Sequence, residues 1–342
     1  MRHARALPLS RRGLLAAGGA VGLGALVTAC GSEDGSGSGK DAKGGGSWSF
    51  TDDRKKKISL KGRPEHIVAY IGAAAALYDF GIDEQITGIF GPSKLKNGKP
   101  DVQAGDFPVD HAQSLGNAWG QFNVEKYATL TPDLLITNMF DPGALFYIPD
   151  DSKKKILELA PSAAITTGRV SMLEPIKRYA ELAEALGADL NAKKVTDAKK
   201  RFEKAAEELR KTAKSHRIKV MACSASAGLF YVSNPKVNAD LIYFSELGVD
   251  FVQPRKTDKG GYFESLSWEN ADKYDADVLF LDNRTATLQP DALTGKPTWS
   301  KLPAVKADQI APWSSEPRFS YAGAAPLIES LTKAIQDAKK VS

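Results

Sequence analysis

Cysteine and histidine are scarce in this sequence, with two and four residues respectively among 342. Two cysteines cannot build the disulfide framework of a small secreted domain. An imidazole site for a first-row metal usually needs more histidines than are found here, so no metal site is expected. His66 precedes an apolar run and His216 ends a charged helical pattern, which leaves His111, in a loop, as the one open candidate ligand.

Recognisable catalytic motifs are missing as well. The sequence has no G-x-S-x-G elbow, which carries the nucleophile of α/β-hydrolases. Gly98-Lys99 is followed by Pro100 and has the wrong upstream glycine spacing for a phosphate-binding loop. Asp106 and Asp110 are close together, but nothing marks them as an acid–base pair. An enzyme is therefore the less favoured class of function, and an exported hydrolase that uses loop carboxylates is kept as the alternative from that class.

The excess of positive charge is confined to the start of the chain. The formal net charge is +5, and residues 1–29 hold four arginines and no acidic residue. Subtracting those four arginines leaves +1 for the rest of the chain. A nearly neutral chain gives no electrostatic case for binding nucleic acid.

Residues 1–29 have the order of a bacterial export signal, with a basic head, an apolar middle and small residues before a cysteine. The head ends in SRRGLL, which resembles a twin-arginine signal, and residues 26–30 read LVTAC, which resembles a lipobox. We therefore expect a cleaved signal peptide at 1–29 and lipidation of Cys30. A permanent N-terminal membrane helix is the alternative, which the position of the cysteine and the polar segment after it both disfavour.

Residues 30–47 are expected to comprise the lipidated cysteine and a flexible linker. Apart from the cysteine they are almost entirely Gly, Ser, Asp, Glu and Lys, which cannot bury enough apolar surface to fold. A Gly/Ser coil of this length reaches roughly 23 Å. The folded part is thus expected outside the cytoplasm, anchored to the cell membrane by lipid.

Short apolar runs alternate with helical patterns along the rest of the chain, which indicates parallel βα units. The expected strands are 67–71, 86–90, 134–137, 163–167, 218–224, 229–232 and 278–281. Residues 48–60 are expected to form an edge strand or arm. The helices expected between and after the strands are 73–80, 156–159, 238–247, 268–274 and 325–338.

Two longer amphipathic patterns interrupt this alternation. Apolar residues recur at helical spacing over 172–186, where Gly187 predicts the end of the helix, and again over 195–213. We therefore expect two three-layer α/β lobes, at 48–169 and 189–342. One long helix at 170–188 is expected to join them.

One pattern occurs in both halves of the chain. Glu125 and Glu269 each follow a helix-capping residue by two positions, and an aspartate comes eight residues later, just before an apolar strand. An acid in the first turn of a helix is stabilising by a few tenths of a kcal/mol, which would be sufficient reason for each glutamate. Together, matching carboxylates on two similar lobes could instead dock arginines of a two-fold symmetric partner.

Four segments carry a resemblance to a known family: residues 63–69 (RPEHIVA), 124–136 (VEKYATLTPDLLI), 172–187 and 268–280. They resemble the iron–siderophore substrate-binding lipoproteins of bacterial ABC importers, which have the class III periplasmic-binding-protein fold. The resemblance implies a monomeric receptor, without enzymatic activity or cofactor, that delivers a ferric siderophore to an ABC permease dimer. It also implies that Glu125 and Glu269 dock on permease arginines. Ala276 stands where the family usually has Pro.

The cargo of this family varies among hydroxamate, catecholate and citrate siderophores, haem and cobalamin. The loops around 91–120 and 284–321 diverge most, and in the family such loops choose the cargo. Their aromatic content looks most like that of ferrioxamine-type hydroxamate binders. Binding of haem or cobalamin by the same fold is the alternative, and a sensory lipoprotein without a transport role is a further one.

Ligands of α/β lobes lie at the carboxyl ends of the strands, and two facing lobes form a cleft there. A hexadentate siderophore already saturates its iron, so the protein needs flat apolar surfaces and donors for metal-bound oxygens, a role that suits arginine. Each candidate could instead be a core aromatic or a solvated arginine. The candidate contacts are Trp119, Phe140, Tyr147, Tyr231, Arg255, Tyr262, Arg284, Trp299 and Trp313.

Overall fold

The computed structural model describes residues 46–342. The expected signal peptide at 1–29, the expected lipidation at Cys30 and nearly all of the linker lie outside the described residues. Within residues 46–342, no helix is both long enough and apolar enough to cross a membrane.

The described chain begins with an antiparallel hairpin of β1 (Trp48–Thr51) and β2 (Lys57–Leu60). The buried carboxylate of Asp52 attaches this hairpin to the first lobe, because it accepts hydrogen bonds from the backbone N–H groups of Lys56 and Ala164, both at 3.1 Å. The indole of Trp48 donates to the carbonyl of Ala185 at 2.8 Å. The expected arm is therefore a hairpin that hydrogen bonds attach to the first lobe at Asp52 and to α4 at Trp48.

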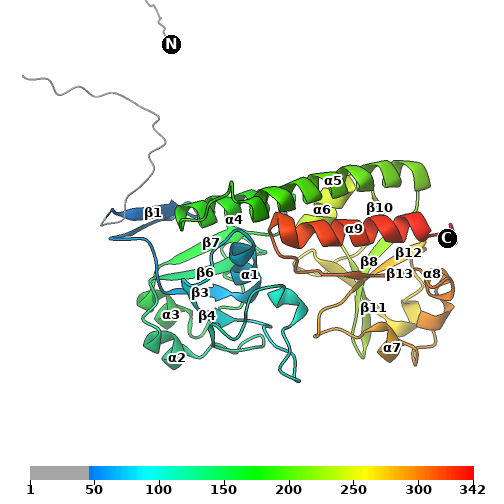
Figure 1. The fold of residues 1–342 in the computed structure, drawn as a ribbon. Coiled ribbons are helices and arrows are strands. Elements are labelled where there is room, and N and C mark those ends of the chain that lie inside the picture. Colours follow the sequence, from blue (N-terminus) through cyan, green and yellow to red (C-terminus); the bar gives the residue numbers. More distant parts are fainter. Residues whose placement is uncertain (1–45) are drawn as a thin grey trace, which may run out of the picture. The chain divides into compact units, whose positions relative to one another are not determined.

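The first sheet is entirely parallel and has the strand order β5-β4-β3-β6-β7 (Figure 1). Its central strands are apolar and fully buried, as expected where helices cover both faces of a sheet. The strands are β3 (Ile67–Tyr70), β4 (Ile86–Phe90), β5 (Gln113–Ser114), β6 (Leu134–Met139) and β7 (Ser162–Thr166).

The second sheet is mixed, with the order β11-β9-β8-β12-β13, and β10 also pairs with β8. The strands β8 and β9 are antiparallel because only three residues connect them, too few for a parallel crossover. The expected parallel alignment therefore fails at β9, which runs antiparallel to both of its neighbours, β8 and β11. The strands are β8 (Lys219–Ala225), β9 (Leu229–Ser233), β10 (Asp250–Phe251), β11 (Phe263–Ser267), β12 (Val278–Asp282) and β13 (Ile310–Trp313).

Helices and 3-10 turns connect and cover the strands. The helices of the first half are α1 (Ile71–Asp79), α2 (Val124–Thr129) and α3 (Lys153–Leu159), with the turn η1 (Val102–Ala104). Those of the second half are α6 (Ala239–Glu246), α7 (Pro290–Leu293), α8 (Pro303–Lys306) and α9 (Tyr321–Asp337), with the turns η2 (Trp268–Asn270) and η3 (Trp299–Lys301). The helix expected at 268–274 is thus only a 3-10 turn.

The connection between the lobes differs from the expected helix at 170–188. The helix α4 (Leu173–Ala185) packs on α1, β1 and β7, which all belong to the first lobe. Gly187, at φ +99°, ends it there. The 24-residue helix α5 (Lys193–His216), about 36 Å long, begins with Lys194 over the Tyr78 ring of α1 and continues to the second sheet beside α9 (Figure 1).

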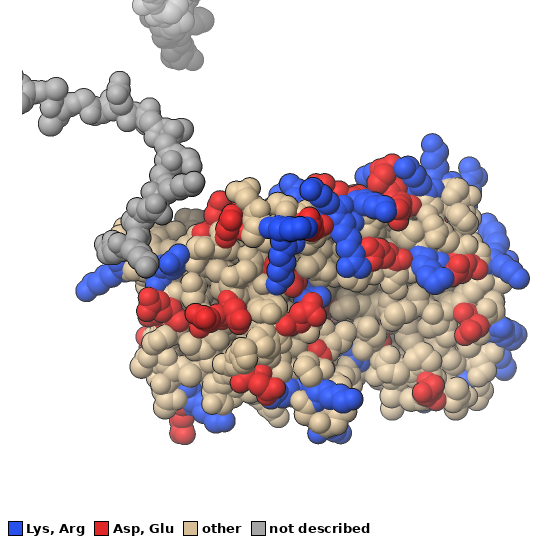
Figure 2. Space-filling model, viewed as in Figure 1, with Lys and Arg blue, Asp and Glu red and all other residues tan. Residues whose placement is uncertain are grey.

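The role of the connecting rod therefore belongs to α5 rather than to α4. Each sheet falls inside one of the expected lobes, 48–169 and 189–342, whose limits stay predictions. The exposed side of α5 is rich in charge of both signs, and Lys and Arg gather along it (Figure 2). The ion pairs along it, such as Lys204 with Glu208, identify this side as a solvated face.

Replacing the ring that fastens α5 is expected to destabilise the fold. Phe202 is 2% exposed, stacks on Tyr243 of α6 with centroids 5.7 Å apart and meets Tyr321 of α9 in a tilted contact at 5.5 Å. Phe202→Ala should lower the free energy of unfolding by about 3–5 kcal/mol, measured by urea denaturation. Lys200→Ala, on the exposed side of the same helix, is the matched control and should change it by less than about 0.5 kcal/mol. Equal losses in the two variants would contradict this packing.

Candidate ligand-binding site

The carboxyl ends of both sheets face one cavity. Phe140 and Asp141 follow β6, and Asp282 ends β12, with Arg284 two residues beyond. All four residues line a cavity of about 760 Å³, whose walls come from both lobes. Crevices at this end of α/β sheets are where such folds bind ligands.

Aromatic rings form most of the wall contributed by the first lobe. The centroids of Phe140 and Phe146 are 4.6 Å apart, and that of Trp119 is 5.5 Å from Phe146. Trp119 is 67% exposed, more than any other large apolar side chain of the described residues. An exposed apolar surface of this kind at a cavity marks a binding surface rather than core.

Hydroxyl groups dominate the wall contributed by the second lobe. Tyr231 of β9 lies opposite Ser224 of β8 and opposite Ser265 of β11, so the three side chains share one face of the sheet. Ser233 and Thr287 extend this polar wall, which lines the same cavity. The cavity is therefore apolar on one side and rich in hydrogen-bonding groups on the other.

Arg284 is held between two carboxylates. Its Nε and Nη2 donate to Asp282, at 3.1 and 2.7 Å, and its Nη1 donates to Glu316. Burial opposes the charged guanidinium, but the two carboxylates outweigh it and raise the pKa of Arg284. Asp282 is completely buried and also accepts from the hydroxyls of Ser224 and Ser315. Arg284 is thus a fixed, permanently charged donor.

Glu316 connects this arginine to the first lobe. Its Oε2 accepts the phenolic proton of Tyr70 at 2.7 Å, and the amide of Gln103 donates to the same oxygen. Burial first, and then the charge of Glu316, raise the pKa of Tyr70, so the phenol stays a donor. Thr285 also donates to Asp101 of the first lobe at 2.9 Å. This edge of the cavity is therefore fastened across the two lobes.

A second set of polar contacts fastens the lobes at another edge. Tyr262 donates to the carbonyl of Phe140 at 2.7 Å and to Asp141 at 3.2 Å. Arg169 donates to Asp141 at 3.0 Å and to the carbonyl of Gly260, with its guanidinium 5.2 Å from the Tyr262 ring centroid. These contacts join the loop after β6, the segment after β7 and the loop before β11.

A buried carboxyl group lies beneath the cavity wall. Trp313, a lining residue, donates its indole N–H to Asp240 at 2.6 Å. Burial raises the pKa of Asp240 to about 7, against the opposing effect of that hydrogen bond. Asp240 therefore contacts a ring that supports the cavity wall.

The structure brings six of the nine candidate ligand contacts together as cavity-lining residues. They are Trp119, Phe140, Tyr231, Tyr262, Arg284 and Trp313. Trp313 is only 1% exposed, so it supports the wall from behind.

The other three candidates do not line the cavity. Tyr147 stacks on Tyr70 and meets Trp119 edge to face, and it is not among the lining residues. Trp299 is a core residue, 2% exposed and packed against Phe230. Arg255 is exposed in a loop whose backbone is held by Glu264 and Tyr274, and neither it nor Trp299 is a lining residue.

Several residues of the cavity escaped the sequence analysis. Asp282 was visible as a polar residue at the end of an apolar strand, and this signal could have identified it. Glu316, Gln103 and the serines of β8 and β11 carry no local pattern, because only the pairing of strands and the facing of lobes brings them together.

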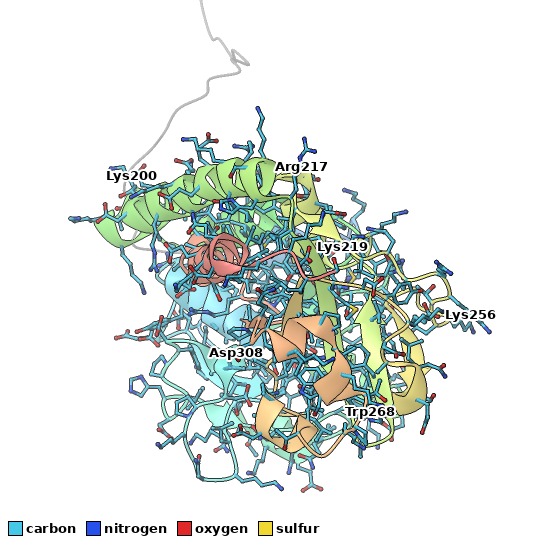
Figure 3. The ribbon with its side chains drawn as sticks, turned by 90° about the vertical axis from the view of Figure 1, so that its right-hand side faces the viewer. Lys200, Arg217, Lys219, Lys256, Trp268 and Asp308 are labelled. Carbon is cyan, nitrogen blue, oxygen red and sulfur yellow. The ribbon has the colours of Figure 1, made fainter. Side chains whose placement is uncertain are left out.

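The two matching glutamates are exposed in the structure. Glu125 lies in the first turn of α2, which the side chain of Asn123 caps by accepting from the N–H of Lys126 at 2.9 Å. Glu269 lies in η2, where its own backbone N–H and then Ser267 lower its pKa. Trp268, its neighbour, lies at the end of the molecule opposite Arg217 and Lys200 (Figure 3).

The described residues contain no group of three or more His, Cys, Asp or Glu side chains arranged to hold a metal ion. His111, the open candidate, is exposed, and His66 and His216 bond to backbone carbonyls of their own surroundings. The cavity carboxylates of the described residues form ion pairs with arginines and do not converge on a common point.

Comparison with known proteins gives a consistent result. The periplasmic binding protein family matches residues 67–317. The crystal structure of DesE, a ferric-siderophore receptor protein from Streptomyces coelicolor, is 52% identical, with a TM-score of 0.83 over 86% of this chain and 100% of that chain.

More distant similarities are found as well, in structure for the first of the following proteins and in sequence for the second. The petrobactin-binding protein YclQ from Bacillus subtilis is 20% identical, with a TM-score of 0.62 over 85% of this chain and 98% of that chain. The Fe(3+)-citrate-binding protein YfmC from Bacillus subtilis (strain 168) is 25% identical over 260 residues, which are 75% of this chain and 76% of that protein.

The buried carboxyl beneath Trp313 is expected to make stability depend on pH. The pKa of Asp240 is about 7 in the folded chain and near 3.9 when unfolded, so the folded chain binds the proton more tightly and loses stability as the pH rises through this range. Relative to Asp240→Asn, the wild type should lose about 2–3 kcal/mol between pH 5 and pH 8, measured by urea denaturation. Asp272→Asn, at an exposed position, should match the wild type. Parallel profiles for wild type and Asp240→Asn would contradict the assignment.

Proposed function

Because the chain belongs to the periplasmic binding protein family, we propose that it captures a ferric siderophore of the hydroxamate, ferrioxamine-like class and delivers it to an ABC importer. The chain is a binding protein and not an enzyme. The observation that carries the proposal is the division of the cavity into an aromatic wall and a wall of hydroxyl groups with one fixed guanidinium.

Both walls suit a ferric trihydroxamate. Its methylene arms are apolar and can lie against Trp119 and Phe140, while its metal-bound oxygens accept hydrogen bonds. Asp282 and Glu316 engage three of the five N–H donors of Arg284, which leaves two for those oxygens. Burying these apolar arms provides affinity, and the charged donor orients the complex.

The charges of the cavity disfavour a strongly anionic cargo. Three monoanionic hydroxamates neutralise ferric iron, whereas catecholate or citrate groups leave the complex negative. Asp141, Asp282 and Glu316 all line the cavity, and Arg284 is already paired. An added anion would therefore meet repulsion rather than free cations.

Haem and cobalamin are the alternative cargoes for this fold. No histidine is among the cavity-lining residues of the described chain, so an iron porphyrin would find no imidazole ligand. The same titration that tests hydroxamates tests these two ligands as well.

Delivery requires the cavity to meet a membrane permease. Glu125 and Glu269 are exposed, one on each lobe, and α2 and η2 lie on the side of the molecule away from α5 (Figures 1 and 3). Two like charges held on a stiff scaffold suit a two-fold symmetric partner. Lipidation of Cys30 would keep this monomeric receptor at the membrane, and the linker would let it turn.

Ferric hydroxamates are expected to quench the tryptophan fluorescence of the purified protein at micromolar concentrations or below, because Trp119 and Trp313 line the cavity. Arg284→Ala should weaken the affinity about tenfold or more, as expected for loss of a charged donor. Arg255→Ala, outside the cavity, is the matched control. A response to haem or cobalamin but to no ferric hydroxamate would refute the proposed cargo.

Loss of both exposed glutamates is expected to abolish delivery without affecting capture. Glu125→Ala combined with Glu269→Ala should leave the fluorescence titration unchanged and remove most of the chelate-stimulated ATP hydrolysis of the reconstituted permease. Glu158→Ala combined with Glu208→Ala removes two exposed glutamates elsewhere and should preserve both readouts. If the variant lacking Glu125 and Glu269 stimulated ATP hydrolysis normally, the docking assignment would be contradicted.

A further inference from the structure

The ionisable groups of the cavity are few and mostly acidic. Asp141, Asp282 and Glu316 are its carboxylates, and Arg284 is its only guanidinium. Neither lysine nor histidine contributes to its walls in the described part of the chain. Tyr262 adds no further negative charge, because burial raises the pKa of its phenol to about 12 and keeps it neutral.

The two arginines that pair with these carboxylates, Arg284 in the wall and Arg169 beside it, are already neutralised. Arg284 contacts Asp282 and Glu316 together, so this cluster keeps one negative charge in excess. At the other edge Arg169 pairs with Asp141, which brings that pair to zero. These three carboxylates and two arginines together therefore carry one net negative charge.

The unbalanced charge lies where solvent screens it poorly. The side chain of Glu316 is 12% exposed and that of Asp282 is fully buried. A charge at a partly buried site acts over a longer distance than one in open water, since fewer ions and water molecules lie around it. A ligand in the cavity thus experiences a negative potential.

We infer that the cavity selects ferric chelates with a positive net charge, so that a hydroxamate complex carrying a protonated amine outside its iron-binding groups binds more tightly than the same complex without that charge. This rests on the proposed function. The neutral iron core leaves the excess carboxylate charge unbalanced, and one ammonium group balances it.

The first-lobe wall also offers the ammonium group a direct contact. The Oδ2 atom of Asp141 accepts no hydrogen bond within the described residues, although its Oδ1 is engaged by Arg169 and Tyr262. Asp141 adjoins Phe140, whose ring belongs to the same aromatic cluster as Trp119. Carboxylate oxygen and ring faces together form a favourable site for an ammonium ion.

The test uses one linear ferric trihydroxamate in three forms that differ only at its terminal amine. The amine is left free, acetylated or succinylated, which gives net charges of one positive, zero and one negative. Titration of the full chain at low salt should show the affinity falling about twofold to fivefold at each step, as for charges roughly 10 Å apart at high effective dielectric. Raised salt should compress the series.

Two variants remove the excess charge at different walls. In Glu316→Gln the contacts to Tyr70 and Arg284 can persist, because the Gln103 amide can flip to accept from the new side chain. In Asp141→Asn the pair with Arg169 loses its negative partner. In each of these two variants the affinities of the three chelate forms should differ from one another by no more than about a factor of two. Glu84→Gln, an exposed change before β4, is the control and should show the same decrease in affinity from form to form as the wild type.

The outcomes separate the two proposals. Failure of all three forms to bind would overturn the proposed function itself. Binding of all three with equal affinity by the wild type would overturn the charge selection while leaving the receptor role intact. A series that survives in both cavity variants would likewise overturn the assignment of the excess charge to these walls.

Discussion

The organisation of this molecule depends on one partly buried ionic cluster, in which Arg284 is fixed between Asp282 and Glu316. Asp282 is fully buried, and a buried carboxylate left without its cation would cost several kcal/mol. Asp282 belongs to the second sheet, and Glu316 reaches Tyr70 of the first lobe. The same cluster therefore sets the position of a ligand donor, the charge of the cavity and the contact between the lobes.

The cluster explains why the cavity can be preformed. Polar contacts cross between the lobes at two edges, around Glu316 and around Tyr262, and α5 packs along α9 behind them. Groups held in this way lose little freedom when a ligand arrives, so less of the binding free energy is spent on ordering them. A stiff receptor with two exposed glutamates can also present them to a partner at a constant separation.

Much of the fold could be predicted from the sequence because the strands of the first lobe are short apolar runs and Gly187 marks the end of α4. The sequence did not reveal which helix bridges the lobes. Amphipathic spacing shows which face of a helix is buried but not which element that face packs against. In the site, strand ends located Phe140 and Arg284. Trp299 and Glu316 could not be assigned correctly from the sequence. Tertiary contacts bury Trp299 in the core and place Glu316 at the cavity, and no local pattern indicates either.

The most direct test of the central claim is a crystal structure of the protein with a ferric trihydroxamate bound. The account predicts iron between the Trp119–Phe140 wall and the Tyr231 wall, with free N–H groups of Arg284 on metal-bound oxygens and both carboxylate contacts of Arg284 retained. A chelate bound outside this cavity, or an Arg284 that leaves Glu316 to reach the ligand, would contradict it.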